Sequence, residues 1–438
     1  MTHKTLVIGT GITGQSIMRH LTHLGKAFDV FDTRDEISSL KMLQTRYPNA
    51  QFYLGTITLI PWQEINQVLV SPGISPSTDV IVEALSRNLP LYGDLELFAH
   101  AQTDKPIIAI TGTNGKSTLV TLVAEILEHA GLNVSLAGNI GQPMLDSLSD
   151  DIDLWVLELS SFQLYYQSSF NAAIACILNI SEDHIDWHGS FDAYNDAKHK
   201  MFKNAELAIF NADDEFTQPN HSIKATAFSI KGSRNALFTF NNDVFMKGSM
   251  PLFHANELRL NGTHNYEDVL AALAIVDAKG IDLTIASEAI KRFEGLPHRT
   301  QCVREIKGIK WINDSKGTNV GATLAALKGM SAMLSGKIIW LAGGQGKGAD
   351  FLPLASTVAK EVRHAILFGE DKEKIASALN HTSAYTFANS MSDAISKAQK
   401  HAKEGDCVLL SPACASFDMF ENYLKRGDAF IEQVNRIN

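Results

Sequence analysis

The stretch TGTNGKST, residues 111–118, follows the apolar run PIIAI and precedes the segment LVTLVAEILEHAG. A short apolar run with turn residues after it is typical of a buried strand, and the segment after the turn is typical of a helix. A strand, a glycine loop and a helix in this order form a phosphate-binding loop, because the N–H groups at the helix start favour an anion. The usual pattern also needs a glycine five places before the Gly–Lys pair, where this chain has Ile110.

The polar residues of this loop predict a nucleotide triphosphate site. Gly112 and Gly115 allow the backbone to approach phosphate oxygens. Lys116 can reach a terminal phosphate, and the hydroxyl of Ser117 or Thr118 can hold Mg²⁺. The alternative, a glycine turn with a chance lysine, is disfavoured because the strand, the lysine and the hydroxyls all agree.

A second glycine loop, GTGITG at residues 9–14, lies a hundred residues earlier and fits G-x-G-x-x-G in full. It follows the apolar run KTLVIG, and the next apolar run, AFDVFD, ends at Asp32. This spacing predicts a Rossmann-like start and would ordinarily suggest NAD, with the acid on a ribose hydroxyl. The residues alone do not exclude that interpretation.

Two further features fall at the ends of expected strands. Glu158 lies inside the apolar run LWVLELS, where a carboxylate costs several kcal/mol unless it is paired or bound to a cation; the alternative is an outward-facing acid on an edge strand. The segment NISEDHIDWHGS, residues 179–190, is either a solvated loop or a candidate shell for Mg²⁺ or Mn²⁺. Its acids and imidazoles are Glu182, Asp183, His184, Asp186 and His188.

Composition limits the classes of protein that remain. With 38 Lys plus Arg against 48 Asp plus Glu, the formal charge is −10, which argues against a general nucleic-acid binder. The four cysteines show no metal-binding spacing and predict reduced thiols in a cytoplasmic protein. No apolar run is long enough for a membrane helix or a signal peptide.

Repeated apolar runs that end in glycine or small-residue turns predict an α/β protein with parallel strands buried on both faces. The 438 residues suggest three domains, and we place them at 1–93, 94–297 and 298–438. The segment 263–280 is expected to form an amphipathic helix that ends at Gly280.

Taken together, these motifs resemble the Mur ligase family. The match rests on TGTNGKST, the Glu of LELSSFQL, NISEDHIDWHGS and the lysine of YNDAKHKMF, and it continues through LAGNIG, GLPHR, NDSKGTN, GGQGKGADF and SPACASFDMF. The short glycine spacing of the phosphate loop is itself a family marker. The resemblance implies three domains: an N-terminal Rossmann-like domain, a central ATPase domain of the phosphate-loop type and a C-terminal Rossmann-like domain.

The resemblance also implies a reaction, namely ATP-driven amide formation through an acyl phosphate and a tetrahedral intermediate. The family member most similar in detail joins D-glutamate to UDP-N-acetylmuramoyl-L-alanine in peptidoglycan precursor synthesis. The expected partners are these small molecules, ATP and two Mg²⁺ ions, with no nucleic acid and no membrane, in a monomeric cytoplasmic enzyme.

The family's functional residues map onto this chain as follows. The catalytic set is Lys116, Glu158, His184 and Lys198, and Mg²⁺ would be held by Ser117, Glu158, His184 and Lys198 as a carbamate. ATP would be bound by Gly112, Thr113, Asn114, Gly115, Lys116, Ser117, Thr118, Asn265, Asp268, Arg299 and Asp314, with His298 beside the ribose and phosphate contacts. The UDP-substrate would contact Ile12, Thr13, Asp32, Thr33, Arg34, Gly73, Asn139 and Ser160. The acceptor amino acid would contact Lys316, Thr318, Lys347, Ser416, Phe417 and Tyr423.

Two positions depart from the family pattern. The family often has Asn where this chain has Asp268, which bears on the adenine contact, and Phe is common where this chain has Tyr423. Without the family match, Lys198 would be interpreted as a solvated helix lysine.

Four alternatives remain at this stage. Another Mur-type ligase would add a different amino acid, but the D-N-P-R type motif of the diamino-acid enzymes is absent. A folylpolyglutamate synthase would begin close to the phosphate loop. An NAD-dependent oxidoreductase needs a hydride-transfer site, which the sequence does not offer. A non-catalytic nucleotide-binding regulator would tolerate loss of Lys116, Glu158 or His184, yet all three are present.

Overall fold

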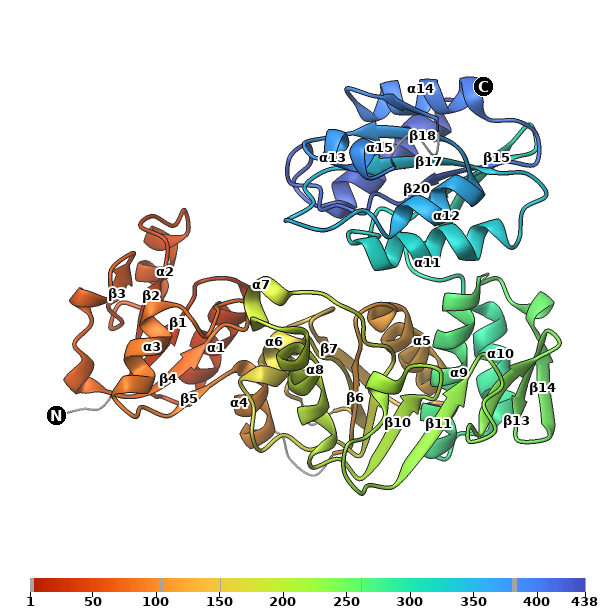
Figure 1. Ribbon diagram of the computed structural model, residues 1–438. Coiled ribbons are helices and arrows are strands. Elements are labelled where there is room, and N and C mark those ends of the chain that lie inside the picture. Colours follow the sequence, from red (N-terminus) through yellow and green to blue (C-terminus); the bar gives the residue numbers. More distant parts are fainter. Residues whose placement is uncertain (1–3, 102–104, 150, 261, 380–383, 438) are drawn as a thin grey trace. The chain divides into compact units, whose positions relative to one another are not determined.

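The computed structural model describes residues 4–101, 105–149, 151–260, 262–379 and 384–437. The chain divides into two compact units, one of residues 1–254 with 267–291 and one of residues 255–266 with 292–438. The first unit contains two sheets and the second unit contains one (Figure 1). The predicted α/β class with largely parallel sheets is confirmed. The domain boundaries at 93/94 and 297/298 stay predictions.

The N-terminal sheet is entirely parallel, with strand order β3-β2-β1-β4-β5. Apolar side chains of β1 alternate between two buried clusters: Val7 packs with α1, and Leu6 and Ile8 pack with α3. The sheet is therefore covered on both faces, as the near-continuous apolar runs predicted. Its strands are β1 (Lys4–Ile8), β2 (Phe28–Asp32), β3 (Phe52–Leu54), β4 (Ile65–Val70) and β5 (Leu91–Tyr92), and its helices are α1 (Ile12–His23), α2 (Leu40–Arg46) and α3 (Asp79–Ser86), with short 3₁₀ turns at Ile57–Leu59 and Trp62–Glu64.

The central sheet has nine strands in the order β14-β13-β12-β11-β10-β9-β6-β8-β7. The phosphate-loop strand β6 (Ile107–Thr111) lies between β8 and β9, so the loop leaves from the middle of the parallel part. Only β12–β13 and β13–β14 pair antiparallel. The other strands are β7 (Val134–Gly138), β8 (Leu154–Glu158), β9 (Ile174–Ile177), β10 (Leu207–Asn211), β11 (Ala225–Ser229), β12 (Phe238–Asn241), β13 (Val244–Lys247) and β14 (Met250–His254).

The helices of this region are α4 (Asp94–Ala101), α5 (Lys116–His129), α6 (Ser161–Tyr165), α7 (Ile185–His188), α8 (Phe191–His199), α9 (Thr263–Ala278) and α10 (Leu283–Arg292), with 3₁₀ turns at Met144–Ser147, Lys200–Phe202, Glu215–Thr217 and Ala255–Glu257. Helix α9 corrects a sequence-based expectation. Every residue from 269 to 276 is at most 1% exposed, so α9 is buried on all sides rather than amphipathic. The small alanines at 271, 272 and 274 permit this close packing, and their apolar character fits an interior helix as well as a one-sided one.

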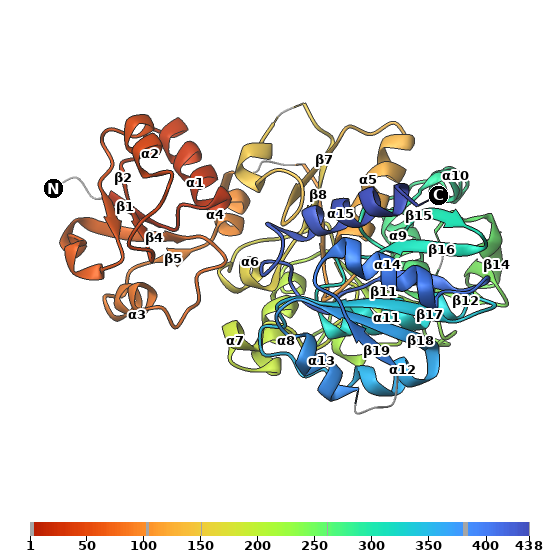
Figure 2. The same cartoon turned by 90° about the horizontal axis from the view of Figure 1, so that it is seen from above.

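The second unit carries a six-stranded sheet in the order β15-β16-β20-β17-β18-β19. Only the hairpin β15–β16 is antiparallel. Helices α11, α12 and α13 pack on one face, and α14 and α15 pack on the other. Figure 2 shows the elements of this unit from above. The strands are β15 (Gln301–Ile306), β16 (Ile309–Asn313), β17 (Ile338–Gly343), β18 (Val362–Phe368), β19 (Tyr385–Phe387) and β20 (Cys407–Leu410), and the helices are α11 (Val320–Ser331), α12 (Leu354–Glu361), α13 (Lys372–Ala378), α14 (Met391–His401) and α15 (Tyr423–Asn435). In the described part of the chain no helix is both long and apolar enough to cross a membrane.

Candidate active site

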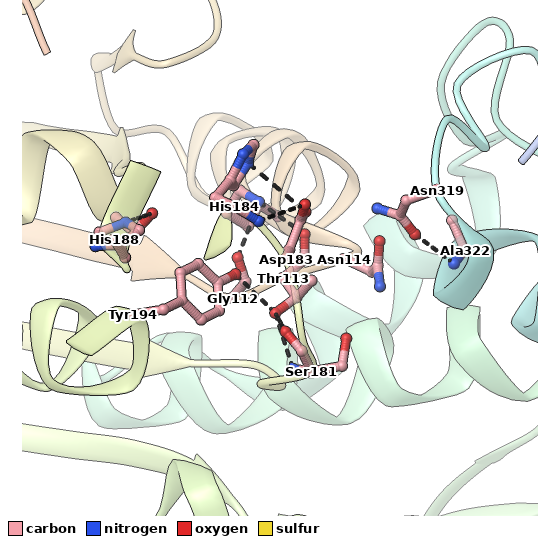
Figure 3. Close-up of polar contacts among 12 residues, drawn as sticks. Gly112, Thr113, Asn114, Ser181, Asp183, His184, His188, Tyr194, Asn319 and Ala322 are labelled. Atoms are coloured by element: carbon pink, nitrogen blue, oxygen red, sulfur yellow. Dashed lines mark hydrogen bonds and ion pairs between the residues drawn. The ribbon is translucent and has the colours of Figure 1, made fainter. Parts of the chain in front are cut away.

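The phosphate loop is held in a single conformation by the segment that follows β9. The side-chain oxygen of Asn179 accepts the N–H groups of Thr113 (3.2 Å) and Asn114 (2.8 Å). The hydroxyl of Thr113 lies 2.9 Å from the Tyr194 hydroxyl and accepts the N–H of Ser181 at 3.0 Å (Figure 3). Three of the loop's polar groups are therefore already fixed, which prepares the remaining N–H groups at the start of α5 for an anion.

Gly115 at the start of α5 has a left-handed backbone conformation, with φ 80°. A Cβ at this position would stand 2.6 Å from a side-chain oxygen of Asp268 and 2.6 Å from Leu178. Only glycine fits both the φ angle and the space. The same contact places the buried carboxylate of Asp268 directly against the loop.

Two lysines converge on one backbone carbonyl. The ammonium of Lys116 donates to the oxygens of Gly112 and Thr113, each at 2.9 Å. The ammonium of Lys198, from α8, donates to the same Gly112 oxygen at 2.8 Å and to the Thr111 hydroxyl at 3.3 Å. A single carbonyl cannot neutralise two cations, so this corner of the site favours anionic ligands.

Lys198 is 1% exposed, so the interpretation of a solvated helix lysine is wrong. Its ammonium lies 4.7 Å from the centre of the Tyr194 ring. Burial, followed by the charge of Lys116, places the pKa of Lys198 well below its ordinary value. Burial and the neighbouring charge thus favour the neutral amine of this lysine over its ammonium form.

Glu158 ends β8, which lies between β6 and β7 in the sheet interior. The edge-strand interpretation is therefore wrong, and the side chain is 1% exposed. One carboxylate oxygen accepts the Asn139 amide at 2.7 Å, while the other has no hydrogen-bond partner within the described residues. A buried carboxylate oxygen without a donor fits a cation.

One hypothesis from the sequence was that the segment 179–190 forms a metal shell. The structure does not show such a shell within this segment alone. Among the described residues, no group of three or more His, Cys, Asp or Glu is arranged to hold a metal ion. Helix α7 turns the side chains of this segment apart. His184 lies beside Asp183 (nitrogen to carboxylate oxygen, 3.6 Å; Figure 3) and packs on the Phe162 ring. His188 instead bonds the Ser161 hydroxyl at 3.0 Å.

His184 has an unusual backbone, with φ 55° in a non-glycine residue. Its side chain remains 46% exposed. Burial lowers the pKa of His184, with Asp183 opposing and Lys116 and Lys198 reinforcing the shift. The imidazole is therefore neutral near neutral pH, which is the form that can bind a metal ion.

The residues expected to hold Mg²⁺ pass a simple chemical test. Magnesium is commonly held by one or two protein oxygens together with substrate phosphates, so no complete protein cage is required. Glu158 offers an unpaired buried oxygen, and Ser117 lies in the first turn of the phosphate-loop helix.

The first glycine loop is organised around a paired acid. Asp32 accepts the Thr10 hydroxyl at 2.6 Å and the Arg34 guanidinium at 2.8 Å and 2.9 Å. Burial opposes its ionisation, but these bonds with Arg34 and Thr10 more than offset that cost and hold the pKa of Asp32 far below its usual range. Ile12 is 76% exposed at the start of α1, and the neighbouring Thr13 is half-buried. Thr33 is exposed beside Arg34.

Aromatic side chains join the loop after β4 to the central region of the same unit. The Tyr166 hydroxyl donates to the Ile74 carbonyl at 2.8 Å, and the Trp187 indole donates to the Gly73 carbonyl at 3.3 Å. These two bonds fix the loop that carries Gly73. Ser160 caps α6, and its hydroxyl and N–H both bond to Gln163.

The remaining predicted nucleotide residues belong to the second unit. Asn313 donates its amide to His298 Nδ1 at 2.9 Å. Asp314 is buried and accepts the Ser411 hydroxyl at 2.7 Å and the Thr300 N–H at 3.1 Å. Burial, opposed by the Ser411 bond, raises the pKa of Asp314 to about 6. Arg299 lies between these residues in sequence and is half-buried, and Asn265 is 8% exposed.

Five of the six predicted acceptor residues follow the carboxyl ends of neighbouring strands of the second unit, and the sixth, Tyr423, begins α15. Lys316 and Thr318 follow β16, Lys347 follows β17, and Ser416 and Phe417 follow β20. The Lys316 ammonium lies 4.2 Å from the centre of the Tyr423 ring, and the Lys347 ammonium lies 5.5 Å from that of Phe417. Adjacent parallel strands thus bring these groups to one edge of the sheet, where open α/β sheets bind ligands.

Comparison with known proteins decides the family. Sequence models described as "Mur ligase MurD-like, N-terminal domain", "Mur ligase middle domain" and "Mur ligase, glutamate ligase domain" match residues 3–93, 110–276 and 298–414. This chain belongs to the Mur ligase family. The Mur ligase from Legionella pneumophila (strain Lens) named UDP-N-acetylmuramoylalanine–D-glutamate ligase is 44% identical over 98% of both chains. The protein of the same name from Pseudomonas fluorescens (strain Pf0-1) is 41% identical over 99% of this chain and 98% of its own.

A solved Mur ligase structure shares the fold. MurF from Thermotoga maritima, determined in complex with ADP, aligns with a TM-score of 0.59 and 14% identity over 99% of this chain and 94% of its own. At this identity the likeness concerns the fold alone.

Sequence reasoning missed several residues that support this Mur ligase site. Thr10 and Asn179 lie inside the quoted motifs GTGITG and NISEDHIDWHGS but were not singled out, since their importance depends on bonds to loops distant in sequence. Asp94 was read only as part of a domain boundary. Asp94 is 3% exposed, and its carboxylate accepts the Gln163 amide at 3.2 Å. It therefore holds the side chain of Gln163, which in turn bonds Ser160.

Asp94 gives a prediction about stability and pH in this Mur ligase. Burial, opposed by the Gln163 bond, raises its pKa from 3.8 to about 6. The stability contributed by the neutral acid is fully present below pH 3.8 and lost as the pH rises through about 6. The loss amounts to about 3 kcal/mol, at roughly 1.4 kcal/mol per pKa unit. We expect Asp94→Asn, which cannot ionise, to gain melting temperature relative to wild type between pH 4 and pH 7.

Glu96, two residues further along α4, supplies a control of opposite sign. Burial disfavours its ionisation, but bonds from Ser168 and Ser169 outweigh burial and lower its pKa. Glu96→Gln should therefore lose melting temperature relative to wild type above the ordinary glutamate pKa, and less below it. A flat difference between Asp94→Asn and wild type across this pH range would contradict the assignment.

Proposed function

We infer that this chain is an ATP-dependent ligase that joins D-glutamate to UDP-N-acetylmuramoylalanine in peptidoglycan precursor synthesis. The observation that carries the inference is the 44% identity to a ligase of that name over 98% of both chains. Identity at this level spans all three matched domains, so it covers the residues expected to hold each substrate.

We propose that the phosphate loop binds ATP and that the substrate carboxylate attacks its γ-phosphate. The attack forms a bond from the carboxylate oxygen to phosphorus and releases ADP. The amine of D-glutamate then adds to the acyl carbon, and phosphate leaves from the tetrahedral intermediate. Lys116 would neutralise the β- and γ-phosphates; its ammonium, with that of Lys198, lies at the Gly112 carbonyl.

The nucleotide part of the other substrate is assigned to the first glycine loop. The Asp32–Arg34 pair fixes the end of β2, and Ile12 offers an exposed apolar face to a base. Thr13, Thr33, Gly73, Asn139 and Ser160 complete the proposed contacts. The G-x-G-x-x-G loop at residues 9–14 thus binds the UDP part of the substrate. The irregular loop at residues 111–118 is where phosphoryl transfer takes place.

Magnesium would be held by Ser117 and Glu158 together with phosphate oxygens, and a second ion by His184 and a modified Lys198. Bound Mg²⁺ would supply charge neutralisation at the transferring phosphate. The protein's own contribution is to keep the second oxygen of Glu158 without a protein donor while Asn139 orients the first.

We propose that Lys198 is carbamylated. Carbamate formation needs a neutral amine, and both burial and Lys116 favour the neutral form of this lysine. A carbamate would place an anion beside the ammonium of Lys116, which is a favourable pairing, and it would offer oxygen ligands.

The acceptor amino acid is assigned to the edge of the second unit's sheet. Two lysines, Lys316 and Lys347, match the two carboxylates of D-glutamate, and Thr318 and Ser416 offer hydroxyls. The aromatic rings of Phe417 and Tyr423 lie against these ammonium groups. A monomeric state and a cytoplasmic location stay predictions.

The test of this function is phosphate release with ATP, Mg²⁺, UDP-N-acetylmuramoyl-L-alanine and one amino acid at a time, with each component omitted in turn. We expect release that requires every component, uses D-glutamate and ignores L-glutamate. Release with another amino acid would show that the chain has a different Mur ligase activity. Failure with every acceptor would overturn the inference and return the first loop to an NAD interpretation.

A pair of reciprocal variants tests the assignment of the two glycine loops. Lys116→Ala should reduce ATP turnover at least about 1,000-fold because it removes the charge on the transferred phosphate, and binding of the UDP-substrate should survive. Arg34→Ala should weaken UDP-substrate binding and leave ATP binding intact. Isothermal calorimetry measures both ligands; loss of both affinities in one variant would refute the division of roles.

The modification of Lys198 predicts chemical rescue. Lys198→Ala should be nearly inactive and should recover part of its activity with added formate or acetate, because a short carboxylate can occupy the place of the carbamate. Lys200→Ala is the matched control, since its half-buried ammonium bonds the Tyr165 carbonyl outside the loop. Lack of rescue, or equal stimulation of both variants, would count against carbamylation.

A further inference from the structure

Arg426 is a fully buried arginine in the first turns of α15. Its side chain is 0% exposed and is among the largest fully buried side chains of the described residues. Arginine is almost never buried without a partner, so its surroundings require an explanation. It was not among the residues that the sequence motifs identified.

Its guanidinium reaches the carboxyl ends of three adjacent strands. It donates to the hydroxyl (3.0 Å) and carbonyl (2.8 Å) of Ser315 after β16, and to the carbonyl of Cys414 (3.0 Å) after β20. A longer bond of 3.5 Å reaches the Gly343 carbonyl at the end of β17. The order β16-β20-β17 makes these strands immediate neighbours, so one side chain joins three loops.

These are the three loops that carry the proposed acceptor contacts. Ser315 directly precedes Lys316, Cys414 lies two residues before Ser416, and Gly343 lies four residues before Lys347. The Ser315 hydroxyl in turn donates to the carbonyl of Tyr423, at the start of the helix that bears Arg426. The guanidinium thus holds the first part of each of these loops: Nε and Nη2 bond Ser315, and Nη1 bonds Cys414 and Gly343.

The charge of Arg426 has no direct acidic partner in the described part of the chain. Its hydrogen-bond acceptors are carbonyl and hydroxyl oxygens, and the ion pairs found there do not include it. Burial lowers its pKa to about 10, which leaves it charged at neutral pH. The carboxylates of Asp418 and Asp314 partly offset the cost of burying this charge without bonding to it, and an anion bound nearby would stabilise it further.

We propose that Arg426 is a positioning residue for the acceptor amino acid, which sets the three loops and contributes a buried positive charge that favours a dicarboxylate. This inference rests on the proposed acceptor site. It explains why a cation whose burial costs free energy lies beneath the proposed site of a ligand with two carboxylates. Arg426 need not touch the ligand, since Lys316 and Lys347, which these loops carry, are the proposed contacts to its carboxylates.

The test compares Arg426→Lys and Arg426→Gln with a matched arginine variant, Arg304→Gln. Arg304 is exposed and also donates to backbone carbonyls, those of Asn435 and Ile437 at the far end of the same helix. For each protein we would measure KM separately for D-glutamate, ATP and UDP-N-acetylmuramoyl-L-alanine, together with kcat and the melting temperature.

We expect Arg426→Gln to raise KM for D-glutamate about 10- to 100-fold, because charged hydrogen bonds to three loops are lost. KM for ATP and for the UDP-substrate should stay within about twofold of wild type, an allowance for the usual scatter of remote changes. Arg426→Lys keeps the charge but not the planar fork, so its effect should be intermediate. Arg304→Gln should leave all three KM values unchanged.

A uniform fall in activity that tracks the melting temperature, or an unchanged KM for D-glutamate, would overturn the proposal. If Arg426→Gln does not fold, the Lys variant decides by the same criterion: a selective rise in KM for D-glutamate supports positioning, and its absence refutes it. Wild type that ignores D-glutamate would instead refute the proposed function, so the two failures are distinguishable.

Discussion

The convergence of Lys116 and Lys198 on the Gly112 carbonyl is the constraint on which the site depends. Two protonated amines at one oxygen would repel each other, which lowers the pKa of Lys198 and favours its neutral form. The arrangement becomes favourable when anions enter, either as phosphate oxygens or as a carbamate on Lys198. The fixed loop and the buried oxygens of Glu158 then surround a place where negative charge is expected to develop. In this view the irregular glycine loop, rather than the regular one, is the reacting site.

The three ligand regions differ in how their charge is balanced. In the N-terminal sheet the acid Asp32 is fully paired with Arg34 and Thr10, which suits a uridine group that needs shape and hydrogen bonds. In the central sheet Lys116 and Lys198 lie among the acids Glu158 and Asp183, which suits the proposed triphosphate with its metal ion. In the second unit Arg426 adds a buried cation beneath two lysines, which suits a dicarboxylate. Charge placed at the carboxyl ends of parallel strands thus underlies each of the three proposed ligand sites.

The sequence was a reliable guide wherever a local pattern determines the structure. The strand–loop–helix around residues 111–118 and the buried Glu158 follow from short-range periodicity and were predicted. The helix at 263–278 was predicted, but its amphipathic character was wrong, because its alanines fit an interior helix and a one-sided helix equally well. The prediction of a metal shell within residues 179–190 was wrong, because the helix α7 separates side chains that are close in sequence. Arg426 could not be found in advance: KRGDAF looks like an ordinary charged helix, and its role depends on partners 12 to 111 residues away.

The most direct test follows oxygen atoms through the reaction. UDP-N-acetylmuramoyl-L-alanine labelled with ¹⁸O in both carboxylate oxygens would be converted with ATP, Mg²⁺ and D-glutamate, and the released phosphate would be analysed by mass spectrometry. If the carboxylate attacks the γ-phosphate at the irregular loop, each phosphate released carries one ¹⁸O atom. Phosphate without the label, formed at the same rate as the amide, would show that ATP cleavage and carboxylate activation are separate events and would contradict this mechanism.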